Sequence, residues 1–313
     1  MCSFDEFLPE LSFVKKTFDI KVGLTFRIEY EKNGKRRGKR MMFRWDGGFI
    51  MVSWDGFEEG IEWYTKHFGW ECLDKIITPV GKKAFLKMPK VGVVTLKSFD
   101  ADYEHFYSGG EEGHMRLCFE VGNLDTTLQY FTENEIITSD PVTLPNGRKT
   151  FDIFCFENAR VTVVENPEND GMFLNARVVG FGEVNSRIGV TDIEKSSMWY
   201  EEVLGFKIEV VNLEKGYALV QTEDAYDRNV LKQAFMDNIY LEKIESQNYM
   251  EGNPSVRTYF DIRPEEFFEA YNHLVKKGAK PSQIAGDPMK GWGGFHFFDP
   301  DGNRINVWSY QMM

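Results

Sequence analysis

The segment Gly294–Tyr310 carries the residue types best suited to chemistry, on two apolar strands joined by a turn. Pro300 presets φ and Gly302 tolerates the positive φ of a tight turn, so the segment predicts a β-hairpin. By strand alternation, one face holds only apolar residues, namely Phe295, Phe297, Ile305 and Val307. The other face mixes polar and aromatic residues, namely His296, Phe298, Arg304, Asn306 and Trp308. Such a mixture suits a ligand cavity, although an ordinary solvated sheet face has the same composition.

His296 is the candidate proton-transfer residue on this mixed face. An imidazole titrates near neutral pH, so His296 could act as a general base or hydrogen-bond a ligand. The alternative is a structural histidine satisfied by a tyrosine or by backbone groups. Trp308, Phe298 and Tyr259 are candidates to stack on a planar ligand. The sequence has no G-x-S-x-G, H-E-x-x-H or G-x-G-x-x-G motif, so nucleophilic serine chemistry has no support.

Composition describes the setting in which these residues act. The chain has 313 residues, of which 42% are hydrophobic and 27% charged, and is long enough for two globular domains. No apolar run is long enough to span a membrane, and the start, MCSFDEFLPE, is acidic where a signal peptide is basic and then apolar. We therefore expect a cytoplasmic protein without a membrane partner. The cysteines form no C-x-x-C pair, which argues against a zinc cluster and against a disulfide framework.

Charge is distributed unevenly along the chain. Residues 1–45 carry a net charge of +5, which leaves −17 on the remainder. An acidic body disfavours nucleic acid and favours neutral or cationic ligands. The basic residues from Lys32 to Arg44 surround Asn33-Gly34 between two strand-like runs. This pattern is typical of a solvated hairpin tip, so we expect residues 1–45 to form an N-terminal hairpin extension.

Four repeats organise the rest of the chain. In each, a strand leads into an amphipathic helix, which is followed by further strand-like runs. The predicted helices end at Gly69, Asn134, Gly205 and Gly278, residues that favour a left-handed helix cap. Each repeat is thus a βαβββ module, and the fold class is α+β. The polar, turn-rich stretch after the second module predicts a linker at 166–183 between two domains of two modules each, at 46–165 and 184–313.

Two stretches carry a family resemblance, VNSRIGVTDIEKSSMWYEEVLGFKIEVV and FHFFDPDGNRINVW. They resemble the vicinal oxygen chelate superfamily, which includes glyoxalase I, extradiol dioxygenases, fosfomycin resistance enzymes and bleomycin resistance proteins. The resemblance covers about residues 46–310 and is strongest in the last two modules. It implies two tandem glyoxalase-like domains, in each of which the curved sheets of paired modules enclose a cavity.

The better-known members of this family are metalloenzymes, with a His on the first strand and a Glu on the last strand of the paired modules. The resemblance places those positions at Asn185, Arg257 and Asn306 in the C-terminal pair and at Phe49, Arg116 and Thr162 in the N-terminal pair. Guanidinium has no lone pair to offer a metal ion and adds a repelling charge. We therefore expect no metal and no other cofactor.

Arginine at the corresponding place of two modules has its own interpretation. Alternation points both Arg116 and Arg257 into a cavity, where a guanidinium could bind a carboxylate, phosphate or carbonyl oxygen. The alternative is an internal ion pair with a cavity carboxylate. Asp152 stands in the second module where His296 stands in the fourth. The predicted ligand-binding residues are therefore Asn185, Arg257, Tyr259, His296, Asn306, Trp308, Arg116 and Asp152.

Three functional classes follow from these patterns. The first is a metal-independent protein that binds a small aromatic or cationic molecule, as the resemblance to the bleomycin resistance type implies. The second is a metal-free isomerase, lyase or cyclase, with His296 as acid or base and Arg257 anchoring an oxyanion or carboxylate. The third is a protein-interaction scaffold that uses the basic N-terminal hairpin. We expect a small-molecule partner and a monomer or homodimer.

Overall fold

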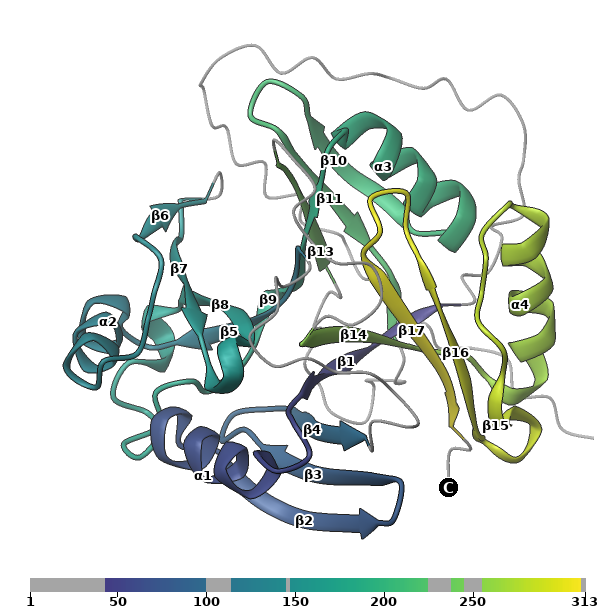
Figure 1. The fold of residues 1–313 in the computed structure, drawn as a ribbon. Helices are drawn as coiled ribbons and strands as arrows, with labels where there is room; N and C mark the ends of the chain where they lie inside the picture. Colours follow the sequence, from purple (N-terminus) through teal and green to yellow (C-terminus); the bar gives the residue numbers. More distant parts are fainter. Residues whose placement is uncertain (1–42, 100–113, 145–146, 225–237, 245–254, 311–313) are drawn as a thin grey trace, which may run out of the picture. The chain divides into compact units, whose positions relative to one another are not determined.

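The computed structural model of the chain describes residues 43–99, 114–144, 147–224, 238–244 and 255–310 (Figure 1). The predicted N-terminal hairpin lies outside these residues, apart from its last three positions, of which Arg44 and Trp45 open the first strand. No helix within the described ranges is long and apolar enough to cross a membrane.

Two mixed β-sheets form the framework of an α+β fold. Sheet A runs in the order β15 (Ala285–Asp287), β16 (Trp292–Phe298), β17 (Arg304–Tyr310), β14 (Val256–Asp261), β1 (Arg44–Met51), β4 (Val93–Phe99), β3 (Gly81–Lys87) and β2 (Glu71–Thr78), and the short β12 (Glu223–Asp224) also pairs with β1. Sheet B runs in the order β10 (Lys207–Asn212), β11 (Tyr217–Gln221), β13 (Asn238–Lys243), β9 (Gly180–Val190), β5 (Met115–Val121), β8 (Arg160–Glu165), β7 (Lys149–Phe154) and β6 (Val142–Thr143).

The helices follow the predicted pattern. They are α1 (Phe57–Phe68), α2 (Leu124–Glu133), α3 (Ile193–Trp199), which continues as a π-helical turn (Tyr200–Leu204), and α4 (Phe267–Lys276). The left-handed caps are confirmed after α1 and after the π-helical turn, where Gly69 and Gly205 have φ of 80° and 77°. A residue with a Cβ would be strained at such φ values, which is why glycine ends these helices.

The predicted pairing of neighbouring modules is wrong. Sheet A combines the first module with the fourth, through antiparallel pairing of β1 with β14, and sheet B combines the second with the third, through β5 and β9 (Figure 1). The ranges 46–165 and 184–313 therefore each divide between both sheets. Local patterns define a module but not its partner. Loop closure adds only about 0.6 kcal/mol for each doubling of loop length, so distance along the chain does not forbid first-to-last pairing.

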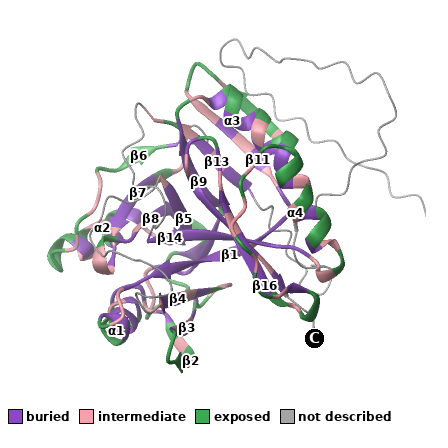
Figure 2. Cartoon of the chain, turned by 45° about the vertical axis from the view of Figure 1, so that its right-hand side comes forward, coloured by how far each residue is buried: buried purple, intermediate pink, exposed green. Residues whose placement is uncertain are grey.

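One hydrophobic core serves both sheets (Figure 2). On the side of sheet A that faces this core, α1 packs against β2, β3 and β4, and Phe267 of α4 meets Phe295 of β16 with ring centroids 5.3 Å apart. In sheet B, α3 packs against β10, β11 and β13. The apolar face predicted for the last hairpin is confirmed as core, because Phe295, Phe297, Ile305 and Val307 are all buried.

The turn of the β16–β17 hairpin also ties the fourth module to the third. The Asp301 carboxylate accepts hydrogen bonds from the Thr191 backbone N–H at 2.9 Å and from the Ser196 hydroxyl at 2.9 Å. The Asp299 carboxylate accepts one from the Tyr200 hydroxyl at 2.9 Å and one from the Asn303 amide at 2.9 Å. Burial raises the pKa of Asp299 to about 6, although these donors oppose the rise.

Candidate functional site

The side of sheet A opposite the core, which we call face A, gathers polar and aromatic side chains from several strands. Strand register determines which of them meet. Phe49 of β1 lies opposite Arg257 of β14. Tyr259, two residues further along β14, lies opposite Asn306 of β17, which in turn lies opposite His296 of β16. The structure therefore brings together the predicted residues of the fourth module and adds Phe49 from the first.

An aromatic cluster separate from the main core lies on face A. The rings of Phe49 and Tyr259 are 4.7 Å apart between centroids and tilted by 50°. Trp308 and Phe99 pack against this pair. Gly294 lies opposite Trp308, and a Cβ there would come within 2.4 Å of the indole, so the glycine provides the room that the Trp308 side chain occupies.

Lys97 of β4 brings a buried ammonium into this cluster. Its Nζ lies 4.2 Å from the Phe49 ring centroid and 4.6 Å from that of Tyr259, and it donates a hydrogen bond to the Tyr259 hydroxyl. Lys97 is 8% exposed and Tyr259 is 9% exposed. Removed from water, an ammonium gains more from aromatic faces than it does at an exposed site.

Arg257 is the second buried cation on face A, and it is 1% exposed. Its guanidinium carbon lies 5.4 Å from the centroid of Phe49, the same ring that Lys97 contacts. Asp261 follows Tyr259 by two residues on β14, and it forms an ion pair with Arg44. Face A thus holds two cations against one aromatic ring, with a carboxylate of the same strand engaged by another arginine.

His296 lies at the edge of face A and is partly exposed. Its Nδ1 is 3.2 Å from Nη2 of Arg304. Since a guanidinium only donates hydrogen bonds, Nδ1 must be the acceptor, which favours the neutral imidazole with its proton on Nε2. The Asn306 side-chain amide donates to the Thr258 carbonyl oxygen at 3.4 Å.

Asn185 does not join these residues, because it belongs to β9 in sheet B. The β9–β13 register passes from Val184 to Ser186 between consecutive residues of β13, which leaves Asn185 as the extra residue of a bulge. The bulge shifts the alternation, and Arg187 rather than Asn185 lies opposite Arg116. Arg187 is therefore the counterpart of Phe49 in sheet B.

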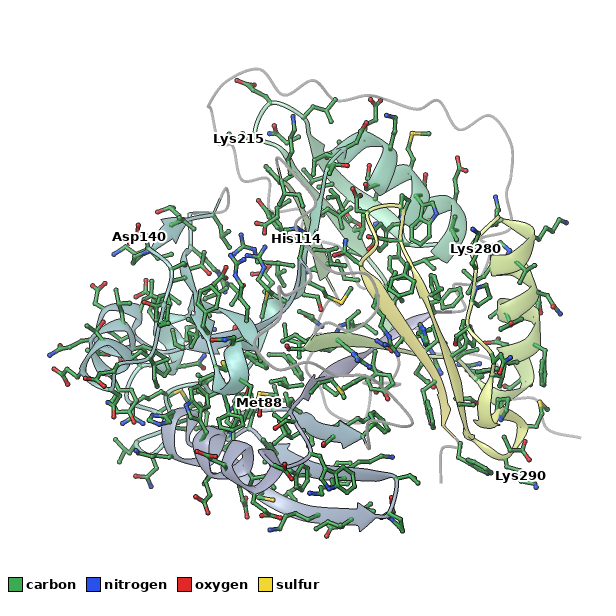
Figure 3. All side chains as sticks on the ribbon, viewed as in Figure 1. Met88, His114, Asp140, Lys215, Lys280 and Lys290 are labelled. Carbon is green, nitrogen blue, oxygen red and sulfur yellow. The ribbon has the colours of Figure 1, made fainter. Side chains whose placement is uncertain are left out.

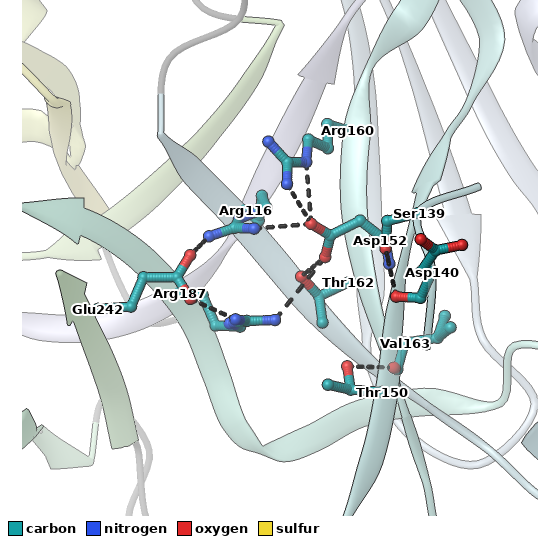
Figure 4. A network of polar contacts seen from close by, with 10 residues as sticks. All are labelled: Arg116, Ser139, Asp140, Thr150, Asp152, Arg160, Thr162, Val163, Arg187 and Glu242. Carbon is teal, nitrogen blue, oxygen red and sulfur yellow. Dashed lines mark hydrogen bonds and ion pairs between the residues drawn. The ribbon is translucent and has the colours of Figure 1, made fainter. Parts of the chain in front are cut away.

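The corresponding side of sheet B, which we call face B, carries an ion-pair network centred on Asp152 (Figure 4). Its carboxylate accepts hydrogen bonds from Nη1 of Arg116 at 2.7 Å, from Nε and Nη2 of Arg160 at 2.9 and 2.6 Å, and from the Thr162 hydroxyl at 2.5 Å. Glu242 of β13 forms ion pairs with Arg116 and with Arg187. The ion-pair alternative therefore describes Arg116, and we leave Arg116 and Asp152 out of the ligand site.

The network on face B shifts the ionisation of its members. Burial opposes the charge on Asp152, but Arg116, Arg160 and Arg187 outweigh it and lower its pKa to about 2. Burial lowers the pKa of Arg116 to about 10, against the attraction of Asp152. His114, which precedes β5 and is labelled in Figure 3, has a pKa lowered first by burial and then by Arg116 and Arg160.

Three residues of the two faces escaped the sequence prediction, namely Lys97, Arg187 and Glu242. Alternation in VVTLKSF does place Lys97 on the same side as Thr95 and Phe99, but a lysine there resembles a solvated residue. Glu242 takes its role from pairing with β9, which the sequence does not show.

A hollow of about 330 Å³ lies away from both faces and is lined by residues 174–177. Its only ionisable residue, Arg177, stacks on Tyr130 with the guanidinium carbon 3.3 Å from the ring centroid. We therefore place the candidate site on face A.

Comparison with known proteins shows a family likeness in part of the chain. The model of the Glyoxalase/Bleomycin resistance protein/Dioxygenase superfamily matches residues 180–307. A crystal structure of a glyoxalase I mutant from Zea mays resembles this chain with a TM-score of 0.59, over 85% of this chain and 94% of that one. Residues 180–307 thus resemble this superfamily in sequence, and the chain as a whole resembles glyoxalase I in fold. The matched residues are the third and fourth modules, which lie in different sheets.

Other similar proteins show how far the likeness extends. Glyoxalase I from Zea mays is 15% identical, with a TM-score of 0.55, over 86% of this chain and 92% of that one, and the mutant is 16% identical. At sequence identities this low, the similarity shows a shared fold. The uncharacterized protein YraH of Bacillus subtilis is 28% identical over 131 residues, which make up 41% of this chain and 95% of YraH.

The side chains at the expected metal positions do not fit a divalent metal ion. On face A, Arg257 and Lys97 present positive charge, and neither guanidinium nor ammonium has a lone pair to donate. On face B, arginines engage the carboxylates of Asp152 and Glu242. Among the residues that the structure describes, no three His, Cys, Asp or Glu side chains gather to hold a metal.

Proposed function

We propose that this protein binds a small planar aromatic molecule carrying an anionic group on face A, and that it does so without a metal ion. The observation that carries the proposal is the pair of buried cations, Lys97 and Arg257, placed over the Phe49 ring in an aromatic cluster. Aromatic side chains stack on a planar ligand, and a guanidinium offers two parallel hydrogen bonds to a carboxylate.

The charge of face A refines the ligand class expected from the sequence. The acidic net charge of the chain favoured a neutral or cationic ligand, and the resemblance to the bleomycin resistance type implied an aromatic or cationic one. Arg257 and Lys97 would repel a cation placed beside them, whereas an anion would gain from both. We therefore still propose an aromatic ligand, but one with a negative instead of a positive charge.

The test is isothermal calorimetry with two probes of similar shape and opposite charge, naphthoate and naphthylmethylamine. We expect naphthoate to bind and the amine to bind at least tenfold more weakly. In Arg257→Met, the affinity for naphthoate should fall about 10- to 100-fold, because a hydrogen bond to a charged group contributes about 1.5–3 kcal/mol. Arg177→Met, which alters an arginine stacked on Tyr130, is the matched control and should bind as the wild type does. Tighter binding of the amine, or no binding of naphthoate, would overturn the proposal.

Metal independence has a separate test. Elemental analysis of the purified protein should find no stoichiometric zinc, iron, nickel or manganese, and native mass spectrometry should show any copurified organic ligand. A chelator should leave naphthoate affinity unchanged. One equivalent of metal that a chelator removes together with binding would contradict the metal-free part of the proposal.

A further inference from the structure

We propose that Tyr259 is a proton-transfer residue on face A and that Lys97 is the positioning residue that stabilises its ionised form. The inference rests on the proposed function, because the proton partner of Tyr259 is the ligand bound on face A. It assigns acid–base chemistry to Tyr259, which the sequence predicts only as a ligand-binding residue, and a supporting role to Lys97, which the sequence does not predict.

The contact between Lys97 and Tyr259 spans three strands. Lys97 lies on β4 opposite Met51 of β1, and Tyr259 lies on β14, on the far side of β1. The lysine side chain passes over the Phe49 ring to reach the phenol. Its ammonium donates to the Tyr259 oxygen, and a charge-assisted hydrogen bond of this kind favours the phenolate over the phenol. Both residues are more than nine-tenths buried, so water screens the attraction weakly.

The strands around Tyr259 carry further charged groups, namely Arg257, Asp261, Arg44, Arg304 and His296. Asp261 forms an ion pair with Arg44, so its negative charge is balanced within that pair.

His296 is less suited to accept a proton than the sequence suggests. The lone pair on its Nδ1 faces the Arg304 guanidinium, and protonation of the ring would place two cations 3.2 Å apart. Tyr259 has the reverse arrangement, since its oxygen faces a cation and becomes more acidic. The geometry thus moves the acid–base role from His296 to Tyr259 and leaves His296 as a hydrogen-bonding residue at the edge of face A.

The proposed step is proton removal from a carbon next to a ligand carbonyl. The phenolate oxygen of Tyr259 forms a bond to the proton as the C–H bond breaks. The C–H electron pair forms the new C=C bond, the π pair of the carbonyl moves onto its oxygen, and Arg257 stabilises the resulting enolate. Tyr259 then returns the proton to the same or a neighbouring carbon. The sequence of events is an isomerisation or exchange that needs no co-reactant.

Tyr240 on face B provides an internal comparison. Burial raises its pKa to about 12, although Arg187, whose guanidinium carbon lies 5.8 Å from its ring centroid, opposes the rise. The cation beside Tyr240 is thus a guanidinium next to its ring, whereas the Lys97 ammonium donates a hydrogen bond to the hydroxyl of Tyr259. This difference is the basis of the comparison between the two tyrosines.

The experiment that tests the inference is spectrophotometric titration of tyrosinate, which needs no ligand. The difference between wild type and Tyr259→Phe isolates the ionisation of Tyr259, and Tyr240→Phe isolates that of Tyr240. We expect Tyr259 to ionise at the lower pH. Lys97→Met should raise its midpoint by about one to three pH units, and Lys97→Arg should restore it. An unchanged midpoint in a folded Lys97→Met would overturn the inference. If Lys97→Met does not fold, the wild type alone tests the inference. Ionisation of Tyr240 at a lower pH than Tyr259 would then overturn the inference.

Proton transfer itself is measured as deuterium uptake from heavy water at the carbon next to the ketone of naphthylpyruvate, followed by NMR. The wild type should accelerate uptake at saturating probe, and Tyr259→Phe should lose at least tenfold of that acceleration, whereas Tyr240→Phe should keep it. Equal rates in wild type and Tyr259→Phe would overturn the catalytic role. Failure of naphthoate to bind would contradict the proposed function, because it would exclude the proposed ligand class. The tyrosine titration needs no ligand, so it tests the role of Lys97 independently of that result.

Discussion

Face A and face B occupy equivalent positions in two sheets built in the same way, yet they treat buried arginine differently. On face B, Arg116 lies opposite Arg187, and the carboxylates of Asp152 and Glu242 pair with both. On face A, Arg257 lies opposite Phe49, and its guanidinium carbon is 5.4 Å from the centroid of that ring. The residue opposite the buried arginine is therefore a second arginine in sheet B and a phenylalanine in sheet A.

Under the proposed function, the two faces have different roles. Partners inside the fold satisfy the buried ion-pair network of face B, and any ligand there would have to displace them at a high desolvation cost. On face A, an anionic ligand would add a favourable charge interaction with Lys97 and Arg257. This comparison predicts that substitutions on face B reduce stability more than substitutions on face A.

The largest expected effect is that of Asp152→Asn. Removing the carboxylate charge leaves Arg116, Arg160 and Arg187 without their shared partner, and breaking a buried pair in this way costs about 3–5 kcal/mol. The free energy of unfolding in urea measures the loss. Asp140→Asn, at an exposed carboxylate that precedes β6, is the control and should change stability by less than about 0.5 kcal/mol. A cost for Asp152→Asn as small as that of the control would remove the distinction between the faces.

The next effect concerns Asp299, a buried aspartate in the turn of the β16–β17 hairpin. Its pKa is raised, whereas that of Asp152 is lowered. Burial raises the pKa of Asp299 to about 6, above its value in the unfolded chain, so the folded state binds the proton more tightly. Stability from this group is present below about pH 4 and is lost as the pH rises through about 6, by about 3 kcal/mol in all. Asp299→Asn should remove that part of the pH dependence. If the free energies of unfolding of wild type and Asp299→Asn changed in parallel between pH 4 and about pH 8, the raised pKa of Asp299 would be contradicted.

Asp152 should show the reverse dependence with a smaller amplitude. Its folded pKa of about 2 lies below the unfolded value, so its contribution is present above about pH 4 and is lost as the pH falls through about 2. The loss is about 2 kcal/mol. Acid unfolding followed by circular dichroism measures it as the difference between wild type and Asp152→Asn. A constant difference between the two proteins from pH 7 to pH 2 would show that the arginines do not hold this carboxylate ionised.

Local patterns predicted the modules, the helix ends and the last hairpin, because each depends on neighbouring residues. Gly69 ends a helix through its own φ, and the alternation from Phe295 to Val307 follows from the geometry of one hairpin. Which modules pair depends on contacts between distant strands, such as that of Phe49 with Arg257, and no local pattern encodes them. The fold class could therefore be predicted, whereas the sheet to which each site residue belongs could not.

The site residues could be predicted only on strands where side chains alternate regularly between the two faces, without a bulge. Arg257, Tyr259, His296, Asn306 and Trp308 come from one regular strand and one hairpin and do meet on face A. Asn185 was displaced from its predicted place by a bulge in β9, which moved every later residue of that strand by one position relative to β13. Lys97 was not predicted because a buried lysine is rare and its aromatic partners come from other strands.

The smallest expected effect is on face A, and it tests the comparison most strictly. Lys97→Met keeps the length and apolar stem of the side chain but removes the ammonium from the rings of Phe49 and Tyr259. A desolvated cation–aromatic contact contributes about 1–2 kcal/mol, and burying methionine instead of a charge recovers much of it, so unfolding free energy should change by no more than about 1 kcal/mol. Asp152→Asn measured under the same conditions supplies the contrast. A loss in Lys97→Met as large as that in Asp152→Asn would mean that face A holds the fold together as face B does, and would weaken its assignment as the recognition surface.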